Sequence, residues 1–320
     1  MDAVKLCYIG AGGFSNACIY PQLHRHPLRL AAVCDLVEDK ALDAQRKYGF
    51  ERVYTDFHAM LDAERPDAVI CIGGPKVHYA VGMQVLDRGI PLYVQKSPAD
   101  TAAQVREMAD LASGKGVVCH VGFNIRSSVA VQRAREATQR PDFGLPNMMI
   151  FRYGLCFGAT LRDVVMDQHC HATDTVRYLM GDAEAVAVER GRCEGITHYA
   201  VMVRFTSGAV GTISFTEGQQ ADKEFLYFEI TGQNGHFLIS HDLDLVYRKG
   251  PAGEADEVYT HGTYGYQPML EWYGYVADLA NFVAAVQGEA PDRTPIADTV
   301  GSMELCEEIY RQLREAGAPE

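Results

Sequence analysis

The sequence has no long apolar segment and few basic residues. Within its 320 residues, no apolar stretch reaches the roughly 20 residues that a membrane-spanning helix needs. Its 29 lysines and arginines are outnumbered by 42 aspartates and glutamates, which gives a formal net charge of −13. Because no run of lysine or arginine interrupts this acidic balance, we expect neither nucleic-acid binding nor attachment to an anionic membrane.

Paired cysteine motifs and a signal peptide are also missing. The nine cysteines are odd in number and scattered, and no Cys-x-x-Cys pair occurs. Several lie inside apolar runs, where a thiol behaves as a small hydrophobic side chain: Cys7, Cys34, Cys71 and Cys119. The first residues lead straight into a glycine turn, without a basic start or a small-residue cleavage site. These features are typical of a cytoplasmic protein with free thiols.

The arrangement of apolar runs divides the chain into two domains. Residues 1–122 alternate short, wholly apolar runs with amphipathic helical segments, a pattern typical of a parallel sheet with helices on both faces. From residue 123 on, runs with strand character follow one another closely. The predicted fold class is therefore α/β: an N-terminal doubly wound Rossmann domain, residues 1–122, followed by an α+β domain, residues 123–320, with a large, mostly antiparallel open sheet.

The second domain is expected to contain several strands, at residues 148–157, 183–189, 199–205, 209–215, 225–231 and 236–239. Helices are expected near 168–180, 273–287 and 298–315, and loops at 250–254 and 261–268. An open sheet leaves one face exposed unless something covers it. We therefore expect a homodimer or homotetramer that forms through the C-terminal sheet.

A glycine-rich turn, Gly10-Ala11-Gly12-Gly13-Phe14-Ser15, follows the first apolar run. The first glycine allows a tight turn, and the second lets the backbone approach a pyrophosphate at the N-terminus of the next helix. Asp35 ends the second apolar run about 20 residues further on, where an acid holds the ribose hydroxyls of a dinucleotide. No arginine directly follows Asp35, so the sequence favours NAD over NADP. A glycine turn that only packs is the alternative.

Three further motifs follow in order: Gly73-Gly74-Pro75-Lys76-Val77-His78, Gln95-Lys96-Ser97-Pro98, and Asp167-Gln168-His169-Cys170-His171-Ala172-Thr173-Asp174. With the segment Val121-Gly122-Phe123-Asn124, they resemble the glucose–fructose oxidoreductase / inositol dehydrogenase / MocA (Gfo/Idh/MocA) family over essentially the whole length. The first family motif is Thr-Pro-Asn-x-x-His, of which only His78 matches. The second is Glu-Lys-Pro, in which Gln95 and Ser97 here replace the glutamate and the proline.

The resemblance implies an NAD(P)-dependent oxidoreductase that transfers a hydride between nicotinamide and a secondary hydroxyl or ketone of a sugar, sugar derivative or cyclic polyol. The implied catalytic set is Lys96, Asp167 and His171. The residues expected at the cofactor are Gly10, Gly12, Gly13, Phe14, Asp35, Gly73, His78, Gln95 and Lys96. The residues expected to contact the substrate are Asn124, Arg152 and Tyr178. Arg126, Arg152, Tyr264 and Tyr266 can reach a polar substrate, with ordinary strand or loop positions as the equal alternative.

The chemistry of these residue types agrees with alcohol oxidation. Histidine suits a general base because its ordinary pKa of about 6.5 lies near working pH. Lys96 follows an apolar run of the sheet, where ligands of open α/β sheets bind, and can stabilise negative charge on the reacting oxygen. If residues 167–178 form one helix, a polar stripe shares one face: Asp167, His171, Asp174 and Tyr178. A solvated helix face is the plain alternative.

The sequence is also compatible with other functions. The His169-Cys170-His171 segment would chelate zinc on a strand, but on a helix the two histidines lie about 200° apart, so no metal is expected. An NAD-dependent enzyme that modifies glycosides by transient oxidation would share the fold, as would a non-catalytic NAD-binding sensor. Retention of Lys96, Asp167 and His171 argues against the sensor. The glycine turn argues against a metal-dependent hydrolase.

Overall fold

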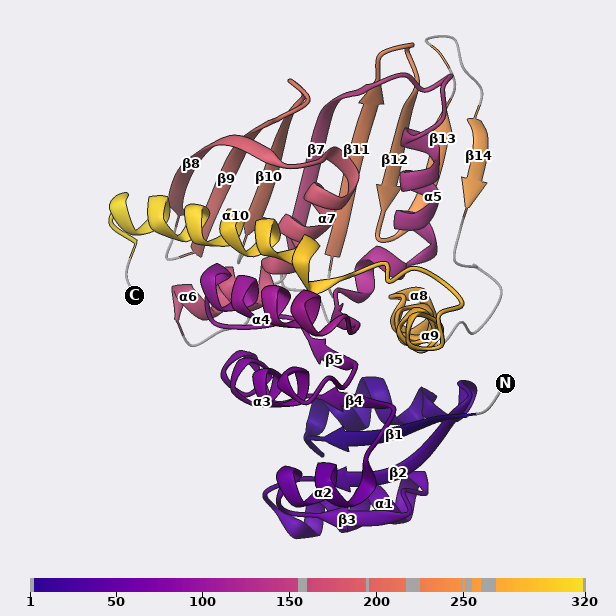
Figure 1. Ribbon diagram of the computed structural model, residues 1–320. Coiled ribbons are helices and arrows are strands. Elements are labelled where there is room, and N and C mark those ends of the chain that lie inside the picture. The colour runs from indigo at the N-terminus through magenta and orange to yellow at the C-terminus, as the bar shows by residue number, and fades with distance from the viewer. Residues whose placement is uncertain are drawn as a thin grey trace. The chain divides into compact units, whose positions relative to one another are not determined.

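The computed structural model describes residues 3–154, 160–193, 196–216, 225–248, 250, 255–259 and 269–318. They form two compact units, residues 1–124 with 275–300, and residues 125–274 with 301–320 (Figure 1). The segment 275–300 packs with the first unit, whereas the boundary expected near residue 122 leaves it in the second. Parts of three expected elements lie outside the described residues: 155–157, 251–254 and 261–268.

The first unit contains a six-stranded sheet in which every neighbouring pair is parallel. Its strands lie in the order β3 (Arg52–Tyr54), β2 (Leu28–Cys34), β1 (Val4–Ile9), β4 (Ala68–Cys71), β5 (Leu92–Gln95) and β6 (Cys119–Gly122). The side chains of β4, β5 and β6 are buried throughout, as apolar strands covered on both faces must be. This arrangement confirms the predicted doubly wound Rossmann domain. Only the three-residue strand β3 is too short and too polar to be foreseen.

Helical segments connect these strands (Figure 1). They are η1 (Ser15–Ile19), η2 (Tyr20–Arg25), α1 (Glu38–Tyr48), α2 (Phe57–Glu64), α3 (Pro75–Asp87) and α4 (Ala102–Lys115), with α9 (Tyr275–Val286) added from the C-terminal half. The segment after the glycine turn differs from a regular α-helix, because η1 is π-helical and η2 is a 3₁₀-helix. Among the described residues, no helix is both long enough and apolar enough to cross a membrane.

A buried polar network binds α9 and its following loop to the sheet within the first unit. The hydroxyl of Tyr93 donates to Asp278 Oδ2 at 2.9 Å, and the Tyr93 ring stacks on His120 at 5.1 Å. His120 Nδ1 lies 2.7 Å from Asp292 Oδ1, and its Nε2 lies 3.3 Å from Asp278 Oδ1, an ion-pair contact rather than a well-aligned hydrogen bond. Burial by itself lowers the pKa of His120, but the two carboxylates outweigh it and raise this pKa to about 9.

Because the pKa of His120 is higher in the folded state, its stabilising contribution is complete below pH 6.5 and disappears as the pH rises through about 9. We expect the free energy of unfolding to fall over this range by an amount on the order of 3 kcal/mol. In His120→Gln, this part of the pH dependence should vanish. Urea unfolding of the unmodified protein and of His120→Gln, from pH 6.5 to about 9, measures this pH dependence. The same pH dependence in the two proteins would contradict the role assigned to His120.

The second unit contains an eight-stranded sheet. Its strands lie in the order β14 (Ala255–Tyr259), β13 (Asp244–Arg248), β12 (Phe237–His241), β11 (Phe225–Gly232), β7 (Pro146–Gly154), β10 (Val210–Thr216), β9 (Ile196–Phe205) and β8 (Ala183–Cys193). Among these described strands only β7 and β10 pair in parallel, so the prediction of a large, mostly antiparallel sheet is confirmed. Strands β13 and β14 extend the sheet beyond the strands expected from the sequence.

Helices α5 (Val129–Thr138), α7 (Cys170–Met180) and α10 (Ile296–Glu315) lie on one face of this sheet (Figure 1). The shorter helical segments in this part of the chain are η3 (Asn124–Ser127), α6 (Leu161–Asp163), η4 (Val164–Gln168) and α8 (Met269–Trp272). The side chain of Gln312 on α10 holds the edge strand β8 through both Val186 O and Val188 N, each at 2.9 Å. Helix α5 was not expected from the sequence.

Candidate functional site

The glycine turn after β1 has the geometry that a nucleotide pyrophosphate requires. Gly10 has a φ of +104°, and a Cβ atom at this position would lie 1.9 Å from the carbonyl oxygen of Ile72, so no other residue fits. A Cβ atom on Gly12 or Gly13 would meet nothing within 4 Å. The turn thus combines a close backbone contact on one side with open space on the other, where a pyrophosphate can approach the backbone.

Ser15, which stands where the dinucleotide pattern has its third glycine, is buried and braces the turn. Its hydroxyl donates to Gly10 O at 2.8 Å and accepts from the hydroxyl of Tyr8 at 3.0 Å. The hydroxyl of Tyr20 also donates to Gly10 O, at 3.1 Å. These hydrogen bonds hold η1 against β1, a task that close packing performs when the third residue is glycine. Sequence reasoning missed the two tyrosines because nothing in their spacing points to the turn.

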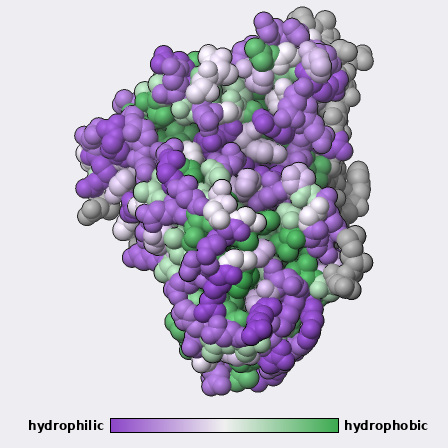
Figure 2. Space-filling view, in the orientation of Figure 1, coloured by the Kyte–Doolittle hydropathy of each residue, from purple (hydrophilic) through white to green (hydrophobic). Residues whose placement is uncertain are grey.

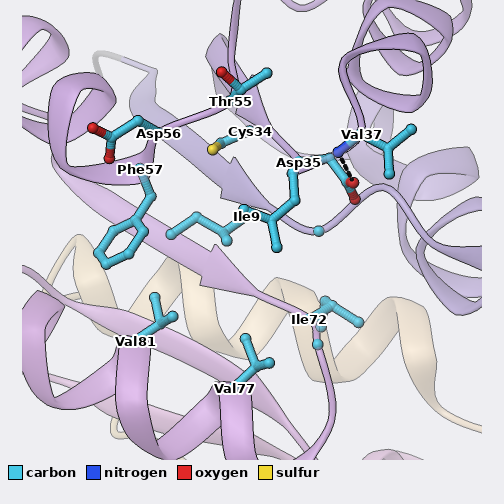
Figure 3. Close-up of a pocket in the computed structure, with 13 residues that line it drawn as sticks. Ile9, Cys34, Asp35, Val37, Thr55, Asp56, Phe57, Ile72, Val77 and Val81 are labelled. Atoms are coloured by element: carbon cyan, nitrogen blue, oxygen red, sulfur yellow. Dashed lines mark hydrogen bonds between the residues drawn. The ribbon is translucent and has the colours of Figure 1, made fainter.

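A cavity of about 650 Å³ adjoins Gly10 and lies entirely within the first unit (Figure 3). Asp35 lies at its edge, with Oδ2 accepting from Ala11 N at 2.7 Å and Oδ1 accepting from Val37 N at 2.9 Å. Two backbone amides therefore fix the orientation of this carboxylate. Apolar side chains form much of the lining: Ile9, Leu36, Val37, Phe57, Ile72, Val77 and Val81. A flat base suits these walls, and ribose hydroxyls suit the carboxylate.

The residues present fit NAD. The open turn, the fixed Asp35 carboxylate and the apolar cavity match its pyrophosphate, ribose and adenine groups in turn. A second carboxylate, Asp56, lines the same cavity, and the residue after Asp35 is the exposed Leu36 rather than a cation. The second carboxylate and the missing cation both disfavour binding of the 2′-phosphate of NADP. Asp56 and Phe57 were missed from the sequence, because the short strand β3 that precedes them could not be foreseen. Phe14, expected at the cofactor, is half-buried against Tyr275.

His78, expected to contact the cofactor, is instead engaged within the protein through both ring nitrogens. Gly73 N and Gly74 N donate to Nε2 at 3.1 and 3.2 Å, and Nδ1 lies 2.8 Å from Ser97 O. Gln95 is 4% exposed, and its Oε1 accepts from Lys96 N at 2.7 Å. Lys96 itself is half-buried directly after the end of β5. Gly73 lines the cavity, as expected of a residue near the cofactor.

In the second unit, the helix expected near residues 168–180 is present as α7, but residues 167–178, on which the polar stripe depends, do not form one regular helix. The amide of His169 donates to Val164 O at 2.9 Å, a five-residue step that makes η4 a π-helical turn, and α7 begins only at Cys170. The additional residue in this turn moves Asp167 out of register with the face of α7. Asp167 is half-buried and accepts from Gln168 Nε2 at 2.8 Å, and His171 lies buried in the first turn of α7.

The two neighbouring histidines have different surroundings. The His169 ring stacks on Phe215 at 4.0 Å, and its Nδ1 is hydrogen-bonded to the hydroxyl of Tyr199, so this ring belongs to the core beneath the sheet. His171 lies on the helix itself. Within the described ranges, no group of three or more His, Cys, Asp or Glu side chains is arranged to hold a metal ion.

The rest of the expected polar stripe is largely occupied by a buried ion pair. Arg126 donates to both carboxylate oxygens of Asp174, at 2.7 and 2.6 Å, and both side chains are about 1% exposed. Ser302 donates to the same carboxylate at 2.8 Å. The Arg126 guanidinium also lies 4.9 Å from the centre of the Tyr178 ring. Asp174 and Arg126 therefore stabilise the second unit, and the stripe is not a row of groups free for substrate.

The other expected substrate contacts are dispersed. Asn124 is buried at the start of η3. Arg152 is exposed on β7, on the sheet face opposite to its buried neighbours Phe151 and Tyr153. Tyr264 and Tyr266 lie outside the described residues. Tyr178 lies on α7 itself, and its hydroxyl accepts from Gln132 Nε2 at 3.0 Å.

The fold and the glycine-turn site define an NAD-binding oxidoreductase. Residues 4–123 match the model of the oxidoreductase family with an NAD-binding Rossmann fold, and residues 163–318 match that of the C-terminal alpha/beta domain of the same family. The chain belongs to the Gfo/Idh/MocA oxidoreductase family. The resemblance seen in the sequence is thereby confirmed, although two residues of the second motif depart from it.

Relatives with assigned activities support this placement. The chain is 24% identical to D-apiose dehydrogenase of Paraburkholderia graminis over 97% of this chain and 88% of that protein. It is 23% identical to myo-inositol 2-dehydrogenase of Thermotoga maritima over 82% of each. A dehydrogenase from Chromobacterium violaceum has the same fold, with a TM-score of 0.88, 20% identity and coverage of 99% and 98%. So does levoglucosan dehydrogenase in complex with NADH and L-sorbose, with a TM-score of 0.84, 18% identity and 98% coverage of each chain.

Substituting Asp35 tests the nucleotide site. Because Asp35→Ala removes a charged acceptor from the ribose position, we expect NADH affinity to fall by about 10- to 100-fold and NADPH affinity to change far less. Fluorescence titration of the bound dinucleotides measures both. Asp39→Ala, which removes an exposed acid from α1, controls for net charge. Tighter binding of NADPH than NADH by the unmodified protein would overturn the assignment.

Proposed function

We propose that the protein is an NAD-dependent dehydrogenase that interconverts a secondary hydroxyl and the corresponding ketone of a sugar, sugar derivative or cyclic polyol. One observation carries the proposal: the chain that has the glycine turn and nucleotide cavity in its first unit also has Lys96 at the end of β5 and His171 in the first turn of α7. The substrate class is supported by relatives named for apiose and myo-inositol, and by a structural neighbour that holds NADH with L-sorbose.

Three residues of the chain have separate roles in the proposed alcohol oxidation: His171, Asp167 and Lys96. His171 takes the proton of the substrate hydroxyl. The Asp167 carboxylate, in the π-helical turn before α7, would contribute only its negative charge, which favours an imidazolium nearby. Lys96 donates a hydrogen bond to the same oxygen and stabilises the negative charge that develops there. The glycine turn and Asp35 would hold NAD, which would supply the hydride acceptor for this oxidation. In the opposite direction, His171 returns the proton to the oxygen.

Replacement of His171 is the direct test. We expect His171→Ala to lower kcat for oxidation of the best substrate in a panel of sugars, inositols and glycosides by about 10²- to 10⁴-fold, because a positioned base is lost. The readout is NADH formation, with NADH binding measured separately and expected to be unchanged. His241→Asn, at an exposed histidine of the same unit, is the matched control.

Turnover within a few-fold of the unmodified enzyme would place the base elsewhere. Cleavage of a glycoside without net NADH formation would instead support transient oxidation, the second chemistry that the same residues can serve.

We also propose that the protein forms a homodimer or homotetramer through the outer face of the eight-stranded sheet. Apolar side chains are exposed on this face: Met148, Ile150, Met202 and Val210. The strand register places Val210 opposite Met148, and Thr212 between Ile150 and Met202, so they form one continuous surface. Exposed apolar patches of this kind mark interaction surfaces. By contrast, the molecular face in Figure 2 is mostly hydrophilic.

A charge placed in this patch should weaken the assembly. We expect Met202→Glu to shift the protein toward the monomer in analytical ultracentrifugation, because a carboxylate would be buried without a partner. Val129→Glu, at another exposed apolar position, should leave the oligomeric state unchanged. A monomeric unmodified protein at micromolar concentration would refute the proposal.

A cytoplasmic location is consistent with the thiols. Among the described residues, Cys7, Cys18, Cys34, Cys71, Cys119, Cys170 and Cys306 are free and buried. Burial raises the pKa of Cys34 and of Cys71 to about 12, which keeps both unreactive. We propose that the protein works in this reducing compartment.

A further inference from the structure

Buried side chains hold two backbone groups next to the Lys96 side chain: the amide of Lys96 itself and the carbonyl of the following residue, Ser97. On one side, Gln95 Oε1 accepts from Lys96 N at 2.7 Å. On the other side, His78 Nδ1 lies 2.8 Å from Ser97 O. His78 is 1% exposed and Gln95 is 4% exposed, so both bonds are shielded from water. The backbone on each side of the lysine therefore has a defined position.

The chemistry of the partners fixes the role of each atom. Gly73 N and Gly74 N can only donate, so His78 Nε2 must accept from them, and Ser97 O can only accept, so Nδ1 carries the proton. His78 is thus the neutral Nδ1–H tautomer. By the same reasoning, Gln95 must present its oxygen to Lys96 N. The Gln95 amide nitrogen has no hydrogen-bond partner among the described residues.

Glycines make room for this arrangement. Gln95 pairs with Gly122 across β5 and β6, and a Cβ atom on Gly122 would lie 2.5 Å from Gln95 Oε1. A Cβ atom on Gly73 would lie 2.5 Å from Val77 Cγ1, at the first turn of the helix that carries His78. Both glycines therefore permit contacts that any larger residue would displace.

We propose that His78 and Gln95 are positioning residues that act through Lys96. The proposal rests on the proposed function, in which Lys96 holds the reacting oxygen. His78 has a second task, because the glycine amides that it accepts from belong to a loop that lines the nucleotide cavity through Gly73. The His78 ring thus connects the nucleotide loop to the Ser97 carbonyl. By contrast, the hydrogen bond described for Gln95 goes to the Lys96 amide and does not reach the nucleotide loop. As a neutral side chain, Gln95 accepts from Lys96 N without placing a negative charge beside the lysine.

The two residues should therefore differ in their effect on binding. We expect Gln95→Met to lower kcat by about 10- to 100-fold, because a small displacement of a catalytic group has consequences of this size, while NADH affinity stays unchanged. Gln95→Glu, which keeps the acceptor for Lys96 N, should recover most of the lost kcat. His78→Ala should lower kcat similarly and also weaken NADH binding by a few-fold. Gln84→Met and His24→Asn, both at exposed positions, are the matched controls.

A double-mutant cycle separates positioning from general stabilisation. If His78 and Gln95 act through Lys96, adding His78→Ala or Gln95→Met to Lys96→Met should reduce kcat no further. Multiplicative losses in the double variants, or a kcat unaffected by Gln95→Met, would overturn the proposal. Near-normal turnover by Lys96→Met alone would instead refute the role of Lys96 in the proposed function. If His78→Ala does not fold, His78→Asn, which retains a donor near the Nδ1 position, replaces it in the cycle.

Discussion

The nucleotide site depends on the contact between Gly10 and the carbonyl group of Ile72. This contact brings the end of β1 against the segment after β4, at the middle of the parallel sheet, and it leaves space only for a hydrogen atom. The turn that results exposes Gly12 and Gly13 on its open side, and the amide of Ala11 reaches the Asp35 carboxylate. The open backbone that can bind a pyrophosphate and the fixed position of the Asp35 carboxylate thus both follow from the close contact between Gly10 and Ile72.

Polar groups around this site are arranged so that each is held by another. Ser15 and Tyr20 donate to the Gly10 carbonyl, and Tyr8 donates to Ser15. His78 connects the Gly73–Gly74 loop to the Ser97 carbonyl. Deeper in the same unit, His120 between Asp278 and Asp292 anchors the segment returning from the C-terminal half. Because these groups are buried, each would be costly without its partner, and their mutual hydrogen bonds define a single arrangement.

Much of this architecture could be predicted from the sequence, since apolar runs and glycine turns act locally. The parallel sheet, the glycine turn and Asp35 follow from such patterns, and the order of motifs identified the family. The register of the α7 region could not be predicted in this way. One π-helical turn before Cys170 separates Asp167 from the helix face, and His169, which follows this turn, packs on Phe215 and is hydrogen-bonded to Tyr199. The Arg126–Asp174 pair, 48 residues apart, likewise leaves no local signal.

By itself, the sequence determined the class of fold, the family and the positions of the glycine turn and its acid, because each depends on residue types at short, regular spacing. Only the tertiary structure decided what the polar residues do. It assigned Asp174 to a buried ion pair, directed both nitrogens of His78 inward, and placed residues 275–300 with the first unit. These outcomes depend on which groups become buried together, and a buried charge or hydrogen-bonding group takes whichever partner the folded chain brings within reach.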